Sequence, residues 1–151
     1  MDRIDRHMLE ILQTEGRLST AELSERVGLS PSPCARRLKR LEDEGYIEGY
    51  QAKLSKPKMG ISMTFFVEVS LNNHQEESIK NFELALADMA EVIGGHIVSG
   101  AYDYLLEVVT PDLAGCEAFT RKLHKLTSVK DIHTHLSVRQ ITTNKSLPIY
   151  V

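Results

Sequence analysis

Apolar residues recur every three or four positions near the start of the chain, a spacing typical of packed amphipathic helices. The first predicted helix covers residues 2–15, with Asp2 as its N-cap. Its apolar stripe consists of Ile4, Met8, Ile11 and Leu12. A second helix begins at Ser19, because Ser19 and Glu22 form a capping-box pattern. We expect this helix to end at Gly28, since glycine readily adopts the left-handed conformation of a helix end.

A third helix, over residues 31–44, follows after a very short turn. Pro31 suits its first position, where a missing N–H has no cost. The spacing of the apolar residues predicts a buried face formed by Cys34, Leu38 and Leu41. The residues predicted to point outwards are Ser32, Pro33, Arg36, Arg37 and Arg40. A helix pair of this kind suits the major groove of DNA, whereas the alternative is a helical protein with a solvated basic face.

The pattern changes to strict alternation after Ile61. Strands are predicted over residues 63–71, 92–99, 103–110 and 129–141, and helices over residues 76–90 and 112–126. The order β-α-β-β-α-β predicts a four-stranded antiparallel sheet with both helices on one face. The expected fold class is therefore α+β, with an N-terminal three-helix winged helix-turn-helix and a C-terminal ferredoxin-like βαββαβ domain.

Proline and glycine among the charges of residues 56–60 favour a domain boundary there. We expect a helix-turn-helix domain at 1–55, a linker at 56–62, a βαββαβ domain for effector binding and oligomerisation at 63–141, and a C-terminal tail at 142–151. Residues 46–54, which are aromatic, β-branched and interrupted by glycine, fit a small β wing or a linking strand.

Charge is distributed unevenly between the two halves of the chain. Residues 1–60 contain 11 basic and 10 acidic side chains, and residues 61–151 contain 7 and 11. Any nucleic-acid surface should therefore lie in the first 60 residues, where the weak net charge favours binding by more than one copy. The uncovered face of the sheet carries Phe66, which predicts packing against a second copy in a homodimer.

Composition indicates a reduced, soluble, cytoplasmic protein. Cys34 and Cys116 are far apart and form no CxxC pair, so neither a disulfide nor a zinc site is expected. No apolar run approaches the length of about 18 residues that a membrane-spanning helix needs, and the charged N-terminus is unlike a signal peptide. His133 and His135 share one side of a strand without a third ligand, so we expect no metal site. No catalytic motif is present, and we expect neither enzymatic activity nor a cofactor.

The chain resembles the leucine-responsive regulator/AsnC family of feast/famine transcription factors over nearly its whole length. The segments that carry the resemblance are DRIDR at 2–6, LSERVGLSPSPC at 23–34, RLKRLE at 37–42, GYI at 45–47 and VSGAYDYLL at 98–106. One departure is Thr127-Ser128, where relatives commonly carry Pro-Gly. The resemblance implies a sequence-specific DNA-binding transcriptional regulator that responds to a free amino acid.

Site residues follow from the same resemblance. The helix at 31–44 would read double-stranded DNA through Ser32, Pro33, Arg36, Arg37 and Arg40. The second domain would dimerise, and dimers would assemble into tetramers or octamers. An amino acid, leucine-like or another, would bind between dimers at Gly100, Ala101, Tyr102 and Asp103, closed by a neighbour's Thr134, His135 and Leu136.

The chemistry of the turn at 100–103 independently suits an amino acid. Asp103 can pair with an ammonium group, and the backbone N–H groups of the turn can hold a carboxylate. The alternative is an ordinary hairpin turn in which the aspartate bonds its own backbone. Two further functions stay open at this point: an amino-acid sensor or regulatory subunit acting through protein partners, and an effector-independent architectural DNA-binding protein.

Overall fold

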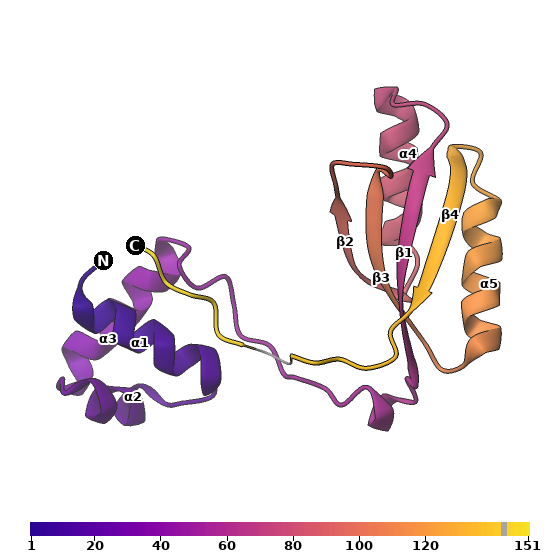
Figure 1. Cartoon of the computed structure of the whole chain (residues 1–151). Coiled ribbons are helices and arrows are strands. Elements are labelled where there is room, and N and C mark those ends of the chain that lie inside the picture. The colour runs from indigo at the N-terminus through magenta and orange to yellow at the C-terminus, as the bar shows by residue number, and fades with distance from the viewer. Residues whose placement is uncertain (143–144) are drawn as a thin grey trace. The chain divides into compact units, whose positions relative to one another are not determined.

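Three helices and the last residues of the chain form the first of two units in the computed structural model, which describes residues 1–142 and 145–151 (Figure 1). The first unit comprises Met1–Lys53 with Ile141–Val151, and the second comprises Leu54–Gln140. The helices of the first unit are α1 (Arg3–Thr14), α2 (Thr20–Val27) and α3 (Pro31–Asp43). The second unit contains η1 (Pro57–Met59), β1 (Met63–Leu71), α4 (Glu76–Ala87), β2 (Val92–Ile97), β3 (Tyr104–Thr110), α5 (Leu113–His124) and β4 (Val129–Leu136).

The helix ends confirm the capping predictions. The Asp2 side chain accepts hydrogen bonds from the backbone N–H groups of Ile4 and Asp5, each at 2.9 Å. Ser19 and Glu22 form a complete capping box at the start of α2. Gly28 ends α2 in the left-handed conformation with φ 68°, which side chains larger than hydrogen disfavour.

The core of the first unit lies where its helices meet. Its buried members are Met8, Leu9, Leu23, Cys34 and Leu41. Cys34 and Leu41 are on the predicted inner face of α3, and Leu38 packs beside them. The expected wing or linking strand at 46–54 forms no strand in the described chain, since a strand needs a partner for its backbone N–H and C=O groups.

The C-terminal residues of the chain pack on α1. The Gln13 amide donates to the Leu147 carbonyl at 3.2 Å, and its oxygen accepts from the Leu147 backbone N–H. Arg6 Nη2 donates to the Val151 carbonyl at 2.8 Å. The side chain of Ile149 packs against the helical core. These residues therefore belong structurally to the first unit.

The sheet of the second unit has the strand order β2-β3-β1-β4, with every neighbouring pair antiparallel (Figure 1). This is the predicted βαββαβ arrangement. The strand β4 ends at Leu136 instead of residue 141, because its pairing with β1 stops at Phe65, two residues after β1 begins. The helix α4 likewise ends at Ala87, before the predicted residue 90.

Both helices of the second unit cover the same face of the sheet. The buried core joins side chains of β1 and β3 to Phe82 of α4 and Phe119 of α5. Within the second unit as the structure describes it, no helix covers the opposite face, and Phe66 on this face is 39% exposed.

Candidate DNA-binding and ligand-binding sites

The outer side of α3 carries the predicted DNA-contact residues. Ser32 and Arg36 are exposed, and Pro33 is half-buried. Across the part of the chain that the structure describes, the Arg36 guanidinium has no hydrogen bond or ion pair. Ser32 and Arg36 are four residues apart and therefore lie on one face of the helix. Because the opposite side of α3 packs into the core, this face is directed to solvent.

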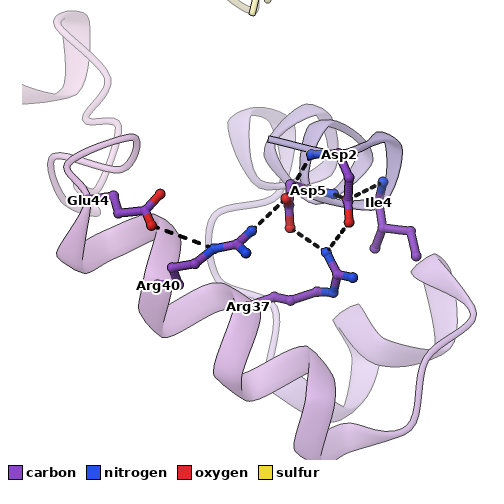
Figure 2. Close-up of polar contacts among 6 residues, drawn as sticks. All are labelled: Asp2, Ile4, Asp5, Arg37, Arg40 and Glu44. Atoms are coloured by element: carbon purple, nitrogen blue, oxygen red, sulfur yellow. Dashed lines mark hydrogen bonds and ion pairs between the residues drawn. The ribbon is translucent and has the colours of Figure 1, made fainter.

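Arg37 and Arg40 differ from Arg36 because both reach the start of α1 (Figure 2). Arg37 Nη1 donates to Asp2 Oδ2 at 2.6 Å and to Asp5 Oδ1 at 2.8 Å. Arg40 Nη2 donates to Asp5 Oδ2 at 2.6 Å, and its Nε lies 3.9 Å from Glu44 Oε1. Arg37 is therefore not fully outward as expected: its side chain is only 27% exposed. The position of Arg37 beside the buried face lets its long side chain turn towards the two carboxylates.

The carboxylates at the start of α1 are strongly held in their charged form. The Asp5 backbone N–H and Arg37 lower the pKa of Asp2 to about 2. Burial opposes ionisation of Asp5, but the Asp2 backbone N–H and Arg37 outweigh it and lower the pKa of Asp5. The same contacts with Asp2 and Asp5 raise the pKa of Arg37. The cluster therefore combines paired charges that all persist at neutral pH.

The predicted effector turn connects β2 to β3. Gly100 has φ 124°, a conformation that residues with side chains rarely adopt. Gly100 and Ala101 are exposed, and Tyr102 and Asp103 are half-buried. The turn is closed by the Val98 backbone N–H, which donates to the Asp103 carbonyl at 2.9 Å. An exposed turn with a glycine leaves its backbone accessible to a ligand.

The Asp103 carboxylate is bonded to a neighbouring segment and not to its own turn. Its Oδ2 accepts from the Leu71 backbone N–H at 2.8 Å, and its Oδ1 lies 2.8 Å from His74 Nε2. The Leu71 hydrogen bond and then His74 lower the pKa of Asp103, with a smaller contribution from Lys130. Asp103 is therefore an ionised acceptor suited to a cation.

The other predicted effector residues lie towards the opposite end of β1. Leu136 pairs with Phe65 and Thr134 with Val67, whereas Asp103 bonds to Leu71. Six residues of extended strand separate Phe65 from Leu71, a distance of ~20 Å. Leu136 and Asp103 are therefore far apart in one chain, whereas Tyr102 and His135 both contact the Glu68 side chain.

Residues 134–136 alternate between the two faces of the sheet. Thr134 lines a cavity of about 340 Å³ together with Cys116, Glu117, Thr120 and Arg121 of α5. His135 Nε2 lies on the other side, 3.3 Å from Glu68 Oε1. Leu136 is 53% exposed. His135 and Thr134 therefore point to opposite faces of the sheet.

Within residues 1–142 and 145–151, no group of three or more His, Cys, Asp or Glu side chains is arranged to hold a metal ion. Among the helices described, none has the length and apolar character needed to cross a membrane. Cys34 and Cys116 are buried free thiols, and burial raises the pKa of each.

A helix-turn-helix unit followed by an α+β unit with an exposed turn between β2 and β3 is typical of a DNA-binding regulator controlled by a small molecule. Residues 1–48 match a model described as winged helix-turn-helix DNA-binding, and residues 64–147 match the Lrp/AsnC ligand binding domain. The chain belongs to the Lrp/AsnC family of transcriptional regulators. It is thus a DNA-binding regulator with an amino-acid-binding domain, and the related proteins are regulators and not enzymes.

Similar proteins cover both units. The leucine-responsive regulatory proteins of Escherichia coli K12 and Salmonella typhimurium are each 39% identical over 150 residues, covering 99% of this chain and 92% of theirs. A transcriptional regulator from Neisseria meningitidis in complex with L-Met has a TM-score of 0.95 and 34% identity, covering 99% of this chain and 97% of its own. An AsnC family regulator from Agrobacterium tumefaciens has a TM-score of 0.91 and 37% identity, with coverage of 98% and 97%.

Sequence reasoning missed Asp5 and His74 as partners of site residues. Asp5 is three residues after the N-cap Asp2, a spacing that already indicates a capping box, but its ion pairs join positions 32 and 35 residues away. His74 lies in the connection between β1 and α4, where no periodic pattern indicates a direction. Neither long-range contact leaves a signal in local spacing.

Proposed function

We propose that the outer face of α3 is the DNA-reading surface, within the region marked by Ser32, Pro33, Arg36, Arg37 and Arg40. The observation that carries this proposal is the unpaired, exposed Arg36 beside Ser32 on one face of a helix whose other side is buried. A helix of this kind enters the major groove with its N-terminal residues against base edges. Arg36 supplies charge for a phosphate or for guanine.

Replacement of Arg36 by alanine tests this surface. We expect Arg36→Ala to weaken binding to a duplex that the wild-type protein selects from random-sequence DNA. Loss of one phosphate contact makes the slope of log affinity against log salt concentration shallower by about 0.9. Loss of a base contact leaves this slope unchanged and reduces the preference for the selected sequence. Lys80→Ala in α4 removes one positive charge from the second unit and is the control. Unchanged affinity and selectivity in Arg36→Ala would refute the proposed surface.

We also infer that an amino acid binds at Gly100, Ala101, Tyr102 and Asp103, with the pocket completed by Thr134, His135 and Leu136 of another subunit. The separation of Leu136 from Asp103 along β1 supports completion of the pocket by another copy. Asp103 would receive the ammonium group, and the turn's N–H groups the carboxylate. The L-Met complex of the Neisseria relative and the names of the leucine-responsive relatives favour an amino acid with an apolar side chain.

A thermal-shift comparison of the common amino acids, with light-scattering mass measured in parallel, tests this site. We expect leucine or methionine to raise the melting temperature, and the charged amino acids to have no effect. A ligand that binds between subunits should also change the mass distribution. Stabilisation by an amino acid with no dependence on protein concentration would contradict a site shared between subunits.

The open face of the sheet supports assembly into at least a dimer. Phe66 is exposed there, although it lies in the middle of β1. We propose that this face pairs two copies and that dimers assemble into tetramers or octamers. A dimer of helix-turn-helix units would bind half-sites on one side of DNA, about one helical turn or ~34 Å apart. Footprinting on the selected duplex measures this spacing.

A further inference from the structure

Asp5 is the most deeply buried charged residue of the first unit, and it has no direct access to DNA. Its side chain is 1% exposed. Its two oxygens accept from Arg37 and Arg40 of α3, and Oδ2 also accepts from the Asp2 backbone N–H at 2.9 Å (Figure 2). A buried carboxylate with this many charged and backbone donors holds a single position.

The contacts of Asp5 join the start of α1 to the middle of α3. The bond from Asp2 belongs to the capping box of α1, so the carboxylate is fixed to the end of that helix. Arg37 and Arg40 are three residues apart and reach it from one side of α3. Arg37 also bonds Asp2, so it connects both acidic side chains. The orientation of α3 relative to α1 is therefore set by three ion pairs in addition to apolar packing.

The basic residues of α3 fall on two sides of the helix, one that faces solvent and one that borders the buried face. Successive residues of an α-helix are about 100° apart. Arg36 therefore lies on the face of Ser32, while Arg37 is turned towards the buried side that carries Leu41. Arg40 lies between these faces and is 46% exposed. The geometry leaves Arg36 available to DNA and occupies the guanidinium of Arg37.

We propose that Asp5 is a positioning residue for DNA recognition: it fixes α3 through Arg37 and Arg40, and Arg37 acts in this clamp instead of contacting DNA. The inference rests on the proposed role of α3 as the reading helix. It separates the arginines into one that contacts DNA, Arg36, and one that orients the helix, Arg37. Loss of the clamp should reduce selectivity for the correct sequence more than it reduces attraction to phosphates.

Salt dependence distinguishes a contact residue from a positioning residue. We expect Arg37→Ala to weaken binding to the selected duplex about tenfold, because a misaligned reading helix loses base contacts, and to leave the slope of log affinity against log salt unchanged. Arg37→Lys should restore part of the affinity, since a lysine at this position can pair with one carboxylate. A slope reduced by about 0.9 in Arg37→Ala would identify a direct phosphate contact and overturn the inference.

Asp5→Asn provides an independent test with the opposite sign of charge change. The substitution removes one negative charge from the unit and leaves Arg37 with Asp2, and Arg40 with Glu44, as the remaining acidic partners. We expect binding to an unrelated duplex to be retained or strengthened, while the ratio of selected to unrelated affinity falls about tenfold. An unchanged ratio in the folded variant would refute positioning by Asp5. If circular dichroism finds this variant unfolded, the decision rests on Arg37→Ala, whose side chain is partly exposed.

The Arg36→Ala experiment separates this inference from the function on which it rests. If Arg36→Ala changes neither affinity nor selectivity, the reading surface itself is wrong. If Arg36→Ala weakens binding and Arg37→Ala lowers the salt slope, the reading surface stands and only the positioning role of Arg37 fails.

Discussion

Asp5 in the first turn of α1 and Asp103 in the turn before β3 form similar kinds of contact, yet their exposure differs. Each carboxylate accepts a backbone N–H and lies beside a basic side chain from another segment. Asp5 is 1% exposed and has two arginine partners, whereas Asp103 is 27% exposed and has one histidine partner. The same side chain is enclosed in one unit and accessible in the other.

The partners determine whether each arrangement can change. A guanidinium is charged at every accessible pH and forms directional bonds, so the Asp5 contacts persist. An imidazole is charged only when protonated, and His74 is 67% exposed. A ligand ammonium can therefore replace His74 at Asp103, while no small cation can reach Asp5. The comparison indicates a rigid DNA-binding unit and an exchangeable contact in the ligand-binding unit.

Removal of Asp5 is expected to have the largest effect on stability. Asp5→Ala leaves Arg37 and Arg40 without their shared partner, at a cost of about 3 kcal/mol in the unfolding free energy of the first unit. Asp103→Ala should cost only about 1 kcal/mol, because water can solvate the groups it leaves. Hydrogen exchange of α1 and β1 peptides measures both. Glu10→Ala, an exposed acidic residue on α1, is the control, and equal losses at Asp5 and Asp103 would remove the distinction.

Substitution of Asp103 is expected to lower the affinity for the amino-acid ligand. Asp103→Asn keeps the shape of the side chain but removes the charge that the proposed site offers to a ligand ammonium, so leucine or methionine binding should weaken about tenfold or more. His74→Ala should retain or increase that affinity, because it removes the competing partner. Calorimetric titration measures both variants. A loss of affinity in His74→Ala equal to that in Asp103→Asn would mean that His74 contacts the ligand instead.

Acid should lower the folding stability of both units, and the loss for each protonated carboxylate should be smaller than the effects of the substitutions above. The folded-state pKa values of Asp2, Asp5 and Asp103 are all lowered from the ordinary value of 3.8, to about 2 in the case of Asp2. A lowered pKa means that the unfolded chain binds more protons, so stability is complete above pH ~4 and is lost as the pH falls towards 2.

Urea unfolding between pH 5 and 2 measures how the unfolding free energy depends on pH. Substitution of single carboxylates then shows which of them cause this dependence. Asp2→Asn should flatten the pH dependence of the first unit, since its paired carboxylate no longer titrates. An equally steep loss of stability in this variant would assign the acid sensitivity to other carboxylates.

Local patterns in the sequence predict the elements of this protein well. Capping residues such as Ser19 and the spacing of Cys34 and Leu41 locate helix ends and buried faces, because both depend on neighbours within a few residues. The ends of β4 and α4 are less predictable, since they depend on contacts with distant parts of the chain. Periodicity does not show that the two units act together in one transcriptional regulator; the family resemblance supplies that information.

The direction of a long side chain depends on distant parts of the chain. Arg36 and Arg37 are adjacent and identical in type, yet only Arg37 lies beside two carboxylates from the first turn of another helix. Helical spacing places Arg37 at the border of the buried face but contains no information about Asp5. For the same reason, Asp103 was predicted as a ligand group without its partners Leu71 and His74.

The packing of Leu147 and Ile149 on the first unit makes that unit discontinuous in sequence. The backbone passes between the units twice, after Lys53 and after Gln140. A recombinant fragment of residues 1–53 would expose the apolar surface that Ile149 covers and leave the Gln13 amide without its backbone partners. To exchange the DNA-binding unit between regulators of this kind, the chain must therefore be divided at two places, after Lys53 and after Gln140. Residues 141–151 must be transferred together with residues 1–53.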